Sequence, residues 1–311
     1  MKEEKNLMVI VGPTAVGKTS TAIDVAIRLN GEIVSADSMQ IYKYMDIGTA
    51  KPTRDEMKGI KHHMIDIIEP DQEFSVADYK KMAEEKIDEI LHTGKLPILT
   101  GGTGLYIKSI TDNYFFSEAD VDWPLRNKLK DQFVKYGKMY MYEKLKQIDP
   151  KTAEKVHPND TKRIIRALEV YEKTGKPISY YYEQTKLRKP KYKLIIYGLE
   201  APRKKLYEKI NKRVDKMIEK GLVQEVKNLL DMGFTKKMNS MKGLGYKQII
   251  DYLEGKLTLD EAINLIKRET RRFAKRQFTW FKKDKRIIWI NTDELNPVDF
   301  IYENYLKFAG K

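Results

Sequence analysis

The stretch LMVIVGPTAVGKTS, residues 7–20, joins an apolar run to a glycine-rich segment. The run LMVIV is typical of a buried strand, and the segment after it fits the pattern G-x-x-x-x-G-K-T and leads into a helical pattern. Backbone N–H groups of such a loop surround phosphate oxygens, the lysine supplies a cation, and the threonine hydroxyl is placed to ligate a phosphate-bound Mg²⁺ ion. The stretch therefore predicts a phosphate-binding loop, without saying whose phosphates it holds. The predicted binding residues are Gly12, Pro13, Thr14, Ala15, Val16, Gly17, Lys18 and Thr19, with Thr19 as the Mg²⁺ ligand.

Strand-like and helical patterns alternate after this loop, which indicates βαβ units and a parallel sheet. Helices are predicted over 18–30 and 76–92. The stretch RIIWINTDE at 286–294 is either a late edge strand or a terminal tether. The pattern as a whole predicts an α/β fold like that of the P-loop NTPases, with a parallel sheet flanked by helices. The predicted strands are LMVIV at 7–11, EIVSAD at 32–37, MIDII at 64–68, LPILTGG at 96–102 and LIIYGLE at 194–200.

Residues 120–193 interrupt this alternation, because the pattern there is helical, charged and rich in tyrosine. They predict an inserted helical lobe between the two parts of a catalytic core, 1–119 and 194–311. The core then continues as a helical C-terminal part, with breaks expected at Gly221 and Gly233.

The composition indicates a basic protein with a polyanionic partner. Lysine and arginine outnumber aspartate and glutamate by 59 to 45, which gives a formal net charge of +14. This balance favours nucleic acid as the partner, although a basic protein without such a partner can have the same composition. The absence of cysteine excludes disulfides, thiolate metal sites and cysteine nucleophiles, and it fits a reducing compartment. With no apolar run of membrane-spanning length and no signal-peptide pattern in MKEEK, we expect a soluble cytoplasmic protein.

Asp37 ends the strand-like run EIVSAD, within the longer segment VSADSMQIYKYMDIGTAKP at 34–52. The carboxyl ends of parallel strands border the ligand crevice, so this carboxylate should lie near the phosphate-binding loop. Three roles are open to it: a structural cap, a Mg²⁺ ligand as in phosphoryl transfer, or a general base acting on an incoming nucleophile. The chemistry of the residue alone does not decide among them.

Together with GPTAVGKT, the segment ADSMQIYKYMDIGTAKP closely resembles the tRNA dimethylallyltransferases, in their bacterial form without a zinc-finger extension. The resemblance extends over residues 7–290. One departure is Tyr44, where the family more often has glycine. Further matching blocks follow in the family's order: HHMIDI at 62–67, LTGGTGLYIKSI at 99–110, HPNDTKRIIRALEVYEKTGKPIS at 157–179, GLEAPRKKLYEKINKRVDKMI at 198–218, MKGLGYKQI at 241–249 and TRRFAKRQFTWF at 270–281.

The resemblance implies an enzyme that transfers a dimethylallyl group from dimethylallyl diphosphate to the N6 amine of the adenosine next to the anticodon in tRNA. The loop would hold the donor's diphosphate with Mg²⁺ as cofactor, and Lys18 and Arg213 would stabilise the departing diphosphate. Asp37 would accept a proton from the exocyclic amine. Thr14 would bond the diphosphate or help to place the amine. The expected catalytic residues are therefore Thr14, Lys18, Asp37 and Arg213.

The same resemblance implies contacts with tRNA, because the target adenine must leave the stacked anticodon stem-loop to be modified. The inserted lobe would bind tRNA. A basic stripe near the C-terminus, formed by Arg271, Arg272, Lys275 and Arg276, suits backbone phosphates. Phe278, Trp280 and Phe281 beside the stripe either stack on bases or belong to the core, which is the commoner fate of aromatic residues. The expected tRNA-binding residues are Asp37, Ser38, Met39, Gln40, Thr103, Arg126, Lys162, Arg163, Arg166, Lys242, Tyr246, Arg271, Arg272, Lys275 and Arg276.

Other interpretations stay open at this point. A small-molecule P-loop kinase, which would bind ATP, explains the loop and Asp37 but leaves the basic stripe unexplained. A non-catalytic RNA-binding module explains the charge but not the loop. Prenylation of free adenine nucleotides is a closer rival, against which the extra lobe and the basic stripe argue. A metal site at His62 and His63 is not expected, because adjacent residues on a regular element point apart. We expect a monomer without membrane contact.

Overall fold

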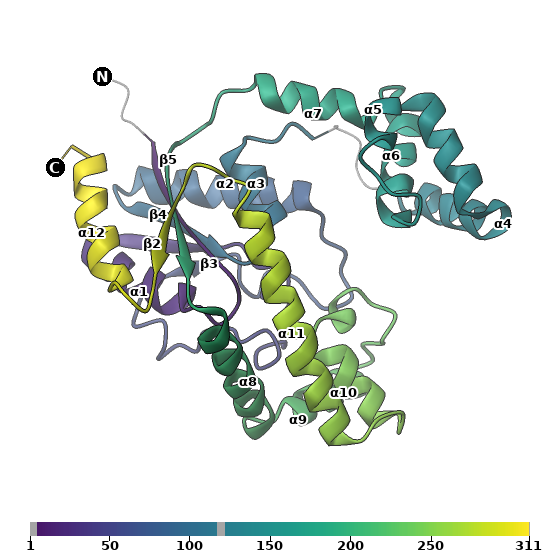
Figure 1. The fold of residues 1–311 in the computed structure, drawn as a ribbon. Coiled ribbons are helices and arrows are strands. Elements are labelled where there is room, and N and C mark those ends of the chain that lie inside the picture. The colour runs from purple at the N-terminus through teal and green to yellow at the C-terminus, as the bar shows by residue number, and fades with distance from the viewer. Residues whose placement is uncertain (1–4, 117–121, 311) are drawn as a thin grey trace. The chain divides into compact units, whose positions relative to one another are not determined.

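The computed structural model describes residues 5–116 and 122–310, and in these residues it contains one six-stranded sheet (Figure 1). All paired strands are parallel, in the order β3-β2-β4-β1-β5-β6. The predicted α/β fold with a parallel sheet is therefore confirmed. The strands are β1 (Asn6–Val11), β2 (Gly31–Ser35), β3 (His62–His63), β4 (Leu96–Gly101), β5 (Lys193–Glu200) and β6 (Ile287–Asn291).

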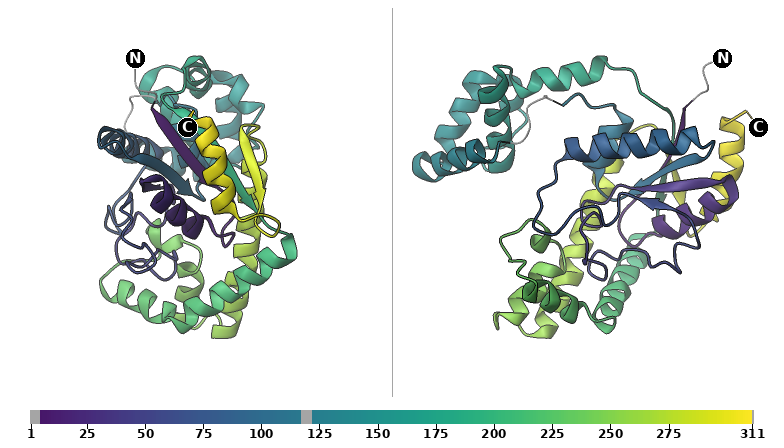
Figure 2. Two further views of the ribbon diagram at one scale, coloured as in Figure 1. Left: turned by 90° about the vertical axis from the view of Figure 1, so that its left-hand side faces the viewer. Right: turned by 180° about the vertical axis from the view of Figure 1, so that it is seen from behind.

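Helices cover the sheet on both faces (Figure 2). The apolar side chains of β1, at the centre of the sheet, are buried. The helices that contact the strands include α1 (Lys18–Leu29), α2 (Val76–His92) and α12 (Pro297–Phe308), and α3 (Gly104–Thr111) follows β4. Met8 and Ile10 belong to one apolar core with α1 and α12. Leu7 and Val9 alternate with them and therefore point to the opposite face. An apolar strand of this kind fits the centre of a sheet, where no face reaches water.

The predicted strand at 64–68 is wrong. β3 ends at His63, and Met64 and Asp66 have φ angles of 64° and 54°, in a left-handed region that an extended strand cannot contain. Ile68 makes only an isolated bridge with Tyr42. The stretch 286–294, for which the sequence left two alternatives, contains β6, which pairs with β5 at the edge of the sheet. It is therefore an edge strand.

The helical C-terminal part forms a second apolar core with the segment that follows β2. Ile41 and Met45 of that segment are buried together with Val214 and Tyr246 of the C-terminal helices. Gly221 has a φ angle of 94° and separates the first two of these helices, as the predicted break requires. The helices are α8 (Arg203–Glu219), α9 (Leu222–Asp231), α10 (Tyr246–Leu253) and α11 (Leu259–Phe281).

Residues 108–191 form a compact unit of their own, and residues 1–107 and 192–311 form the other. In the smaller unit, Leu129, Met141 and Leu168 are buried in a separate apolar core. No helix in the described residues is both long and apolar enough to cross a lipid bilayer. The helices of the smaller unit include α4 (Trp123–Ile148), α5 (Pro150–Ala153), α6 (Thr161–Thr174) and α7 (Ile178–Leu187).

Candidate active site

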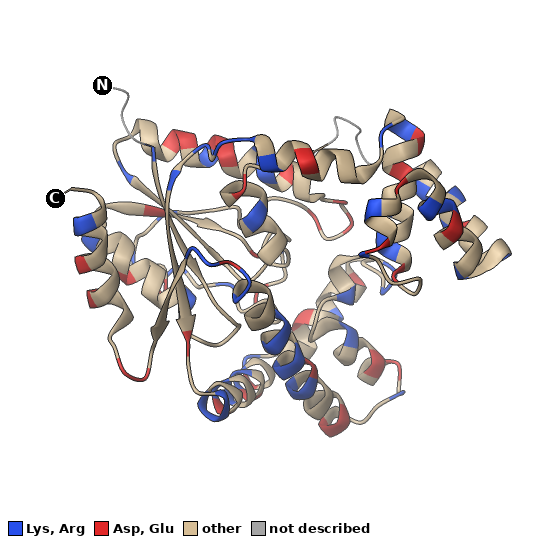
Figure 3. Ribbon diagram, turned by 45° about the horizontal axis from the view of Figure 1, so that its top comes forward, with Lys and Arg blue, Asp and Glu red and all other residues tan. Residues whose placement is uncertain are grey.

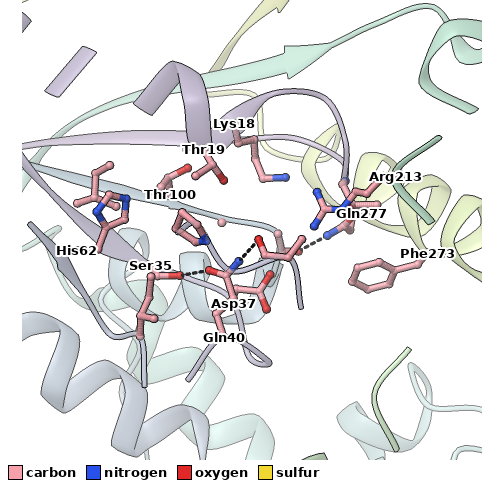
Figure 4. Close-up of a pocket in the computed structure, with 17 residues that line it drawn as sticks. Lys18, Thr19, Ser35, Asp37, Gln40, His62, Thr100, Arg213, Phe273 and Gln277 are labelled. Carbon is pink, nitrogen blue, oxygen red and sulfur yellow. Dashed lines mark hydrogen bonds between the residues drawn. The ribbon is translucent and has the colours of Figure 1, made fainter. Parts of the chain in front are cut away.

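Three loops meet at the carboxyl edge of the sheet, because β4 lies between β1 and β2. β1 leads into the phosphate-binding loop, β2 leads into Asp37, and β4 leads into Gly102. A pocket opens where the three loops meet, and Figure 4 shows the side chains that line it. Asp37 thus shares one pocket with the phosphate-binding loop. The wall of this pocket includes Lys18, Thr19, Asp37, Gln40, Arg213 and Gln277.

The phosphate-binding loop takes its shape from two glycines and a lysine. Gly12 has a φ angle of 148°, and a Cβ atom there would lie 2.6 Å from the carbonyl oxygen of Leu199 in β5. Gly17 has a φ angle of 105° at the N-cap of α1. Nζ of Lys18 donates to the carbonyl oxygen of Pro13 at 2.9 Å. The loop therefore curves around the N-terminus of α1, where backbone N–H groups attract anions.

Two cations meet one carboxylate in this pocket. Arg213 extends from α8 into the wall that also holds Lys18 and Asp37. Burial and then the positive charge of Arg213 lower the pKa of Lys18 to about 8, while Asp37 acts in the opposite direction. Burial also lowers the pKa of Arg213, which Asp37 counteracts. Two crowded cations with a single acid favour an anionic ligand.

Asp37 is held by the turn that follows β2. Its Oδ1 accepts a hydrogen bond from the backbone N–H of Met39 at 2.9 Å, which orients the carboxylate. The backbone N–H of Ser38 donates to Oγ1 of Thr103 at 3.0 Å, which holds the same turn against the end of β4. In Figure 4 the Asp37 side chain lies across the pocket from Lys18. The carboxylate is therefore fixed at the edge of the space that a ligand of the loop would occupy.

Gln40 stabilises the segment that follows Asp37 through hydrogen bonds of its side chain. Oγ of Ser35 donates to Oε1 of Gln40 at 3.2 Å. Nε2 of Gln40 lies 3.4 Å from the carbonyl oxygen of Thr49 and 3.3 Å from that of Ala50, and it donates to both. Gln40 thus joins the end of β2 to the backbone nine and ten positions after Gln40 itself. This side chain supports the pocket wall, and its expected contact with tRNA stays a prediction.

Glu225 on α9 holds the far end of the same segment, and the sequence did not single it out. Its carboxylate accepts hydrogen bonds from the three backbone N–H groups of residues 46–48, at 3.0, 2.7 and 3.0 Å. It also accepts from the hydroxyl of Tyr246 at 2.7 Å. Tyr246 is 0% exposed, so its side chain does not reach a surface that tRNA could touch here. Lys242, the other residue expected from the same block, is exposed.

Gln277 of α11 is a second pocket residue that the sequence did not single out. Its Oε1 accepts from the backbone N–H of Thr14 at 2.8 Å, and its Nε2 donates to the carbonyl oxygen of Gly102 at 3.0 Å. This buried amide therefore joins the phosphate-binding loop to the loop after β4. The only sequence signal for it was its place in the block TRRFAKRQFTWF.

A family model described as IPP transferase matches residues 40–284. The chain belongs to this family. The tRNA dimethylallyltransferases of Acetivibrio thermocellus and Carboxydothermus hydrogenoformans are both 56% identical to it, over 299 and 306 residues. These alignments cover 96% of each chain in the first case and 98% of each in the second. The family resemblance of the sequence is therefore confirmed.

Solved structures of a tRNA isopentenylpyrophosphate transferase and of a dimethylallyltransferase share the fold of this chain. The full-length tRNA isopentenylpyrophosphate transferase from Bacillus halodurans is 43% identical with a TM-score of 0.72, over 99% of this chain and 96% of that one. A eukaryotic dimethylallyltransferase described as acting on tRNA is 28% identical with a TM-score of 0.84, over 99% of this chain and 80% of that one. The P-loop NTPase-like arrangement is thus shared along nearly the whole chain.

The basic stripe of this chain lies on α11 (Figure 3). Arg272, Lys275 and Arg276 are exposed. Arg271 is half-buried and donates to Oδ1 of Asn211 on α8 at 2.7 Å. Three of the four expected phosphate contacts therefore face solvent, whereas Arg271 joins α11 to the helix that carries Arg213.

The aromatic residues beside the stripe have different surroundings. Phe281 is 3% exposed, and the ring of Phe278 packs edge-on against Trp289 with centroids 5.4 Å apart. Trp280 is 40% exposed, although its indole covers Gly104 so closely that a Cβ atom there would collide with it. Packing thus accounts for Phe278 and Phe281, and Trp280 combines packing with an open face.

Within the smaller unit, two of the expected tRNA-binding arginines bond to a buried acid. The Glu169 side chain is 0% exposed, and its Oε2 accepts from Arg126 at 2.8 Å and from Arg166 at 2.9 Å. Lys162 and Arg163 on the same helix as Arg166 are exposed. Arg126 and Arg166 therefore stabilise this unit, and Lys162 and Arg163 have the surroundings that a phosphate contact requires.

The two adjacent histidines have separate partners. Nε2 of His63 lies 2.7 Å from Oε2 of Glu32, and Nδ1 of His62 lies 2.8 Å from the carbonyl oxygen of Ile60. Residues 5–116 and 122–310 contain no group of three or more histidine, cysteine, aspartate or glutamate side chains that could hold a metal ion. His62 lines the pocket, and its buried Nε2 has no hydrogen-bond partner in the described part of the chain.

Tyr44, which departs from the family pattern, has a φ angle of 64°. Glycine adopts this left-handed conformation without the strain that a Cβ atom causes, which is a physical reason for the family's glycine. The Tyr44 side chain is 47% exposed, so burial of its ring compensates for little of that strain.

Proposed function

We propose that this chain transfers a dimethylallyl group from dimethylallyl diphosphate to the N6 amine of the adenosine next to the anticodon in tRNA, with release of diphosphate. The observation that carries the proposal is the pocket, in which a phosphate-binding loop, two cations and one carboxylate converge. Identity of 56% over nearly the full length to proteins named tRNA dimethylallyltransferase supports the same activity. The bond that breaks is then carbon to oxygen, and no phosphoryl group moves.

The cations of the pocket suit a departing diphosphate. As the allylic C–O bond breaks, negative charge grows on the leaving group, and cations already in place stabilise that charge. Lys18 and Arg213 repel one another in the pocket, so a bound diphosphate would remove an unfavourable interaction as well as form favourable ones. Thr14 lines the same pocket and would bond the diphosphate or help to place the amine.

Asp37 suits the role of general base. The exocyclic amine of adenine is a weak nucleophile because its lone pair is delocalised into the ring. A carboxylate that takes the amine proton as the new C–N bond forms lowers the barrier. The electron pair of the breaking C–O bond leaves with the diphosphate, and the proton of N6 moves to Asp37. The bond from Met39 keeps the carboxylate oriented for this transfer.

The residues of the pocket fit a Mg²⁺ ion that is bound mainly through the diphosphate. Mg²⁺ at phosphates usually takes one or two protein oxygens and completes its shell with phosphate oxygens and water. Thr19 lines the pocket at the start of α1, and its hydroxyl would hold the ion. When bound, the ion would offset negative charge on the leaving group.

We propose tRNA as the acceptor because a mononucleotide needs no long basic surface. Arg272, Lys275 and Arg276 on α11 present exposed cations at helical spacing, which suits a phosphate backbone. Lys162 and Arg163 of the smaller unit offer further exposed cations. A monomeric state and a cytoplasmic location stay predictions from the sequence.

One experiment tests this proposal against its rivals. The protein is mixed with Mg²⁺, labelled dimethylallyl diphosphate and either unmodified tRNA or AMP, and the acceptor that gains the label is identified. We expect label in tRNA at the adenosine next to the anticodon, with one diphosphate released per label transferred. Label in AMP but not in tRNA would indicate a nucleotide prenyl transferase, and formation of ADP from ATP with a small acceptor would indicate a kinase.

A further inference from the structure

One peptide group of the phosphate-binding loop is held at both ends. The peptide between Pro13 and Thr14 accepts at its carbonyl oxygen from Nζ of Lys18 at 2.9 Å. Its N–H donates to Oε1 of Gln277 at 2.8 Å, across 263 residues of sequence. The orientation of this peptide therefore depends both on the cation of the loop and on a side chain of α11.

Gln277 has little freedom to turn away from this peptide. It is 6% exposed, and its Nε2 donates to the carbonyl oxygen of Gly102 at 3.0 Å. A Cβ atom on Gly102 would collide with this Nε2 and would lie 4.0 Å from Nζ of Lys18. Rotation of the amide would leave buried donors and acceptors unpaired, which is costly. Gln277 and Lys18 therefore lie on the same side of Gly102 and hold the same peptide.

The exposed side of the same helix carries the basic stripe. α11 runs from Leu259 to Phe281 over 23 residues, so a shift of its exposed side moves its buried side as well. Arg271 also joins α11 to Asn211, two positions before Arg213 on α8. α11 is thus bonded directly to the phosphate-binding loop and also to α8, the helix that carries the second pocket cation.

We propose that Gln277 is a positioning residue that couples RNA binding on the exposed side of α11 to diphosphate binding in the loop. This inference rests on the proposed function, because it takes the two substrates from there. RNA phosphates on α11 restrict the helix, Gln277 passes that restriction to the Pro13–Thr14 peptide, and the peptide keeps Nζ of Lys18 beside the loop. By linkage, each ligand then strengthens the binding of the other by the same factor.

Binding measurements on the full chain test this coupling without turnover. Calorimetry measures the affinity for pyrophosphate with Mg²⁺, first without tRNA and then with saturating unmodified tRNA. The affinity for tRNA is likewise measured with and without pyrophosphate. In the wild-type protein we expect reciprocal strengthening on the order of 5- to 10-fold. Gln277→Met keeps the length and bulk of the side chain but removes both hydrogen bonds. In this variant each ligand should still bind, and the strengthening should disappear.

Gln248→Met is the matched control. Gln248 on α10 is 5% exposed, and its Oε1 accepts from the backbone N–H of Gly245 at 2.9 Å. The same substitution there removes a comparable buried hydrogen bond outside the pocket, so the coupling should persist. If circular dichroism shows that Gln277→Met does not fold, Gln277→Asn replaces it. Asparagine keeps the amide but is one methylene too short to reach both partners, so the same loss of coupling is expected.

The outcomes separate this inference from the proposed function. Wild-type protein that binds each ligand equally well with and without the other would overturn the coupling and leave the proposed transfer intact. Coupling that survives in Gln277→Met, or that is lost equally in Gln248→Met, would overturn the role of Gln277. Wild-type protein that binds neither pyrophosphate nor tRNA would count against the proposed function, and the inference would fall with it.

Discussion

Arg213 in the larger unit and Arg126 in the smaller one are both arginines that the family resemblance assigned to ligands, yet their surroundings differ. Arg213 shares a pocket with Lys18 and helps to lower the pKa of that lysine. Arg126 donates to Glu169, a buried acid that Arg166 also bonds. A cation placed beside another cation indicates an anion that the protein does not itself supply, whereas a cation beside a buried acid contributes to the fold. Charge in the pocket is thus arranged for a ligand, and this charge in the smaller unit is arranged for stability.

Asp37→Asn tests the pocket side of this comparison with the largest expected effect. The amide oxygen can still accept the bond from Met39, but the group can no longer take a proton. Single-turnover transfer should therefore slow by on the order of 100- to 10,000-fold, while tRNA affinity persists. Glu169→Gln is the matched control, because the same chemical change there should lower the melting temperature. If Asp37→Asn kept about half of the wild-type rate, Asp37 would not be the general base.

Arg213→Ala and Arg126→Ala should affect different properties. Arg213→Ala removes a cation that repels Lys18, so the free energy of unfolding should be unchanged or higher while the transfer rate falls. Arg126→Ala takes one partner from the buried Glu169 and should lower the free energy of unfolding by about 1.5–3 kcal/mol. Urea unfolding and single-turnover rates measure the two properties. If Arg213→Ala lost stability and Arg126→Ala lost only transfer rate, Arg213 would be the stabilising arginine and Arg126 the one that serves a ligand.

Replacement of Arg272, Lys275 and Arg276 together by alanine compares the exposed cations of the two units. Each lost phosphate contact should reduce the slope of log tRNA affinity against log salt by a little under one unit, and the loss should be similar across tRNA sequences. Pyrophosphate affinity should stay nearly unchanged. The double variant Lys162→Ala and Arg163→Ala measures, in the same assay, how much the exposed cations of the smaller unit contribute to tRNA binding. An unchanged slope in the triple variant and a reduced slope in the double variant would show that tRNA phosphates contact the smaller unit and not α11.

The lowered pKa of Lys18 predicts a modest dependence of diphosphate binding on pH. Since this pKa is about 8 in the unliganded pocket, the amine is charged below that value and neutral above it. An anion favours the charged amine, so binding above this pH requires uptake of a proton. Pyrophosphate affinity should therefore fall by up to about tenfold per pH unit above the pKa of Lys18. The same calorimetry on Lys18→Met gives the pH dependence that comes from pyrophosphate itself. If this variant and the wild-type protein had the same pH profile, the dependence would not come from Lys18.

Tyr44→Gly should have the smallest effect, and it acts on stability alone. Removal of a Cβ atom from a left-handed residue should raise the free energy of unfolding by roughly 0.5–1 kcal/mol, with an unchanged transfer rate. Asn30 has a similar φ angle of 51°, and asparagine tolerates that conformation. Asn30→Gly should therefore change stability less than Tyr44→Gly in the same urea titration. Equal effects at both positions would show that the ring of Tyr44 forms stabilising contacts of its own.

Residues 7–37 show how much of this protein could be predicted from short-range patterns. An apolar run, a glycine-rich loop and helical periodicity placed β1 and α1, and the order of parallel strands placed Asp37 beside the loop. The predicted helix 76–92 agrees with the bounds of α2, where Ser75 and Asp78 form a capping box. The strand predicted at 64–68 failed because its apolar pattern carries no sign of the left-handed angles at Met64 and Asp66.

Gln277 and Glu225 mark what only the tertiary structure decided. Gln277 bonds to the phosphate-binding loop across 263 residues, and Glu225 bonds to the backbone at 46–48 across 177 to 179. Arg213 was assigned only through the family resemblance, because by periodicity alone it is indistinguishable from a solvated charge on a helix. The sequence determined four of the predicted strands, the first helices and the chemistry of the loop, because these depend on neighbouring residues. The side chains that complete the pocket come from distant segments, and only the packing of the whole chain brings those segments together.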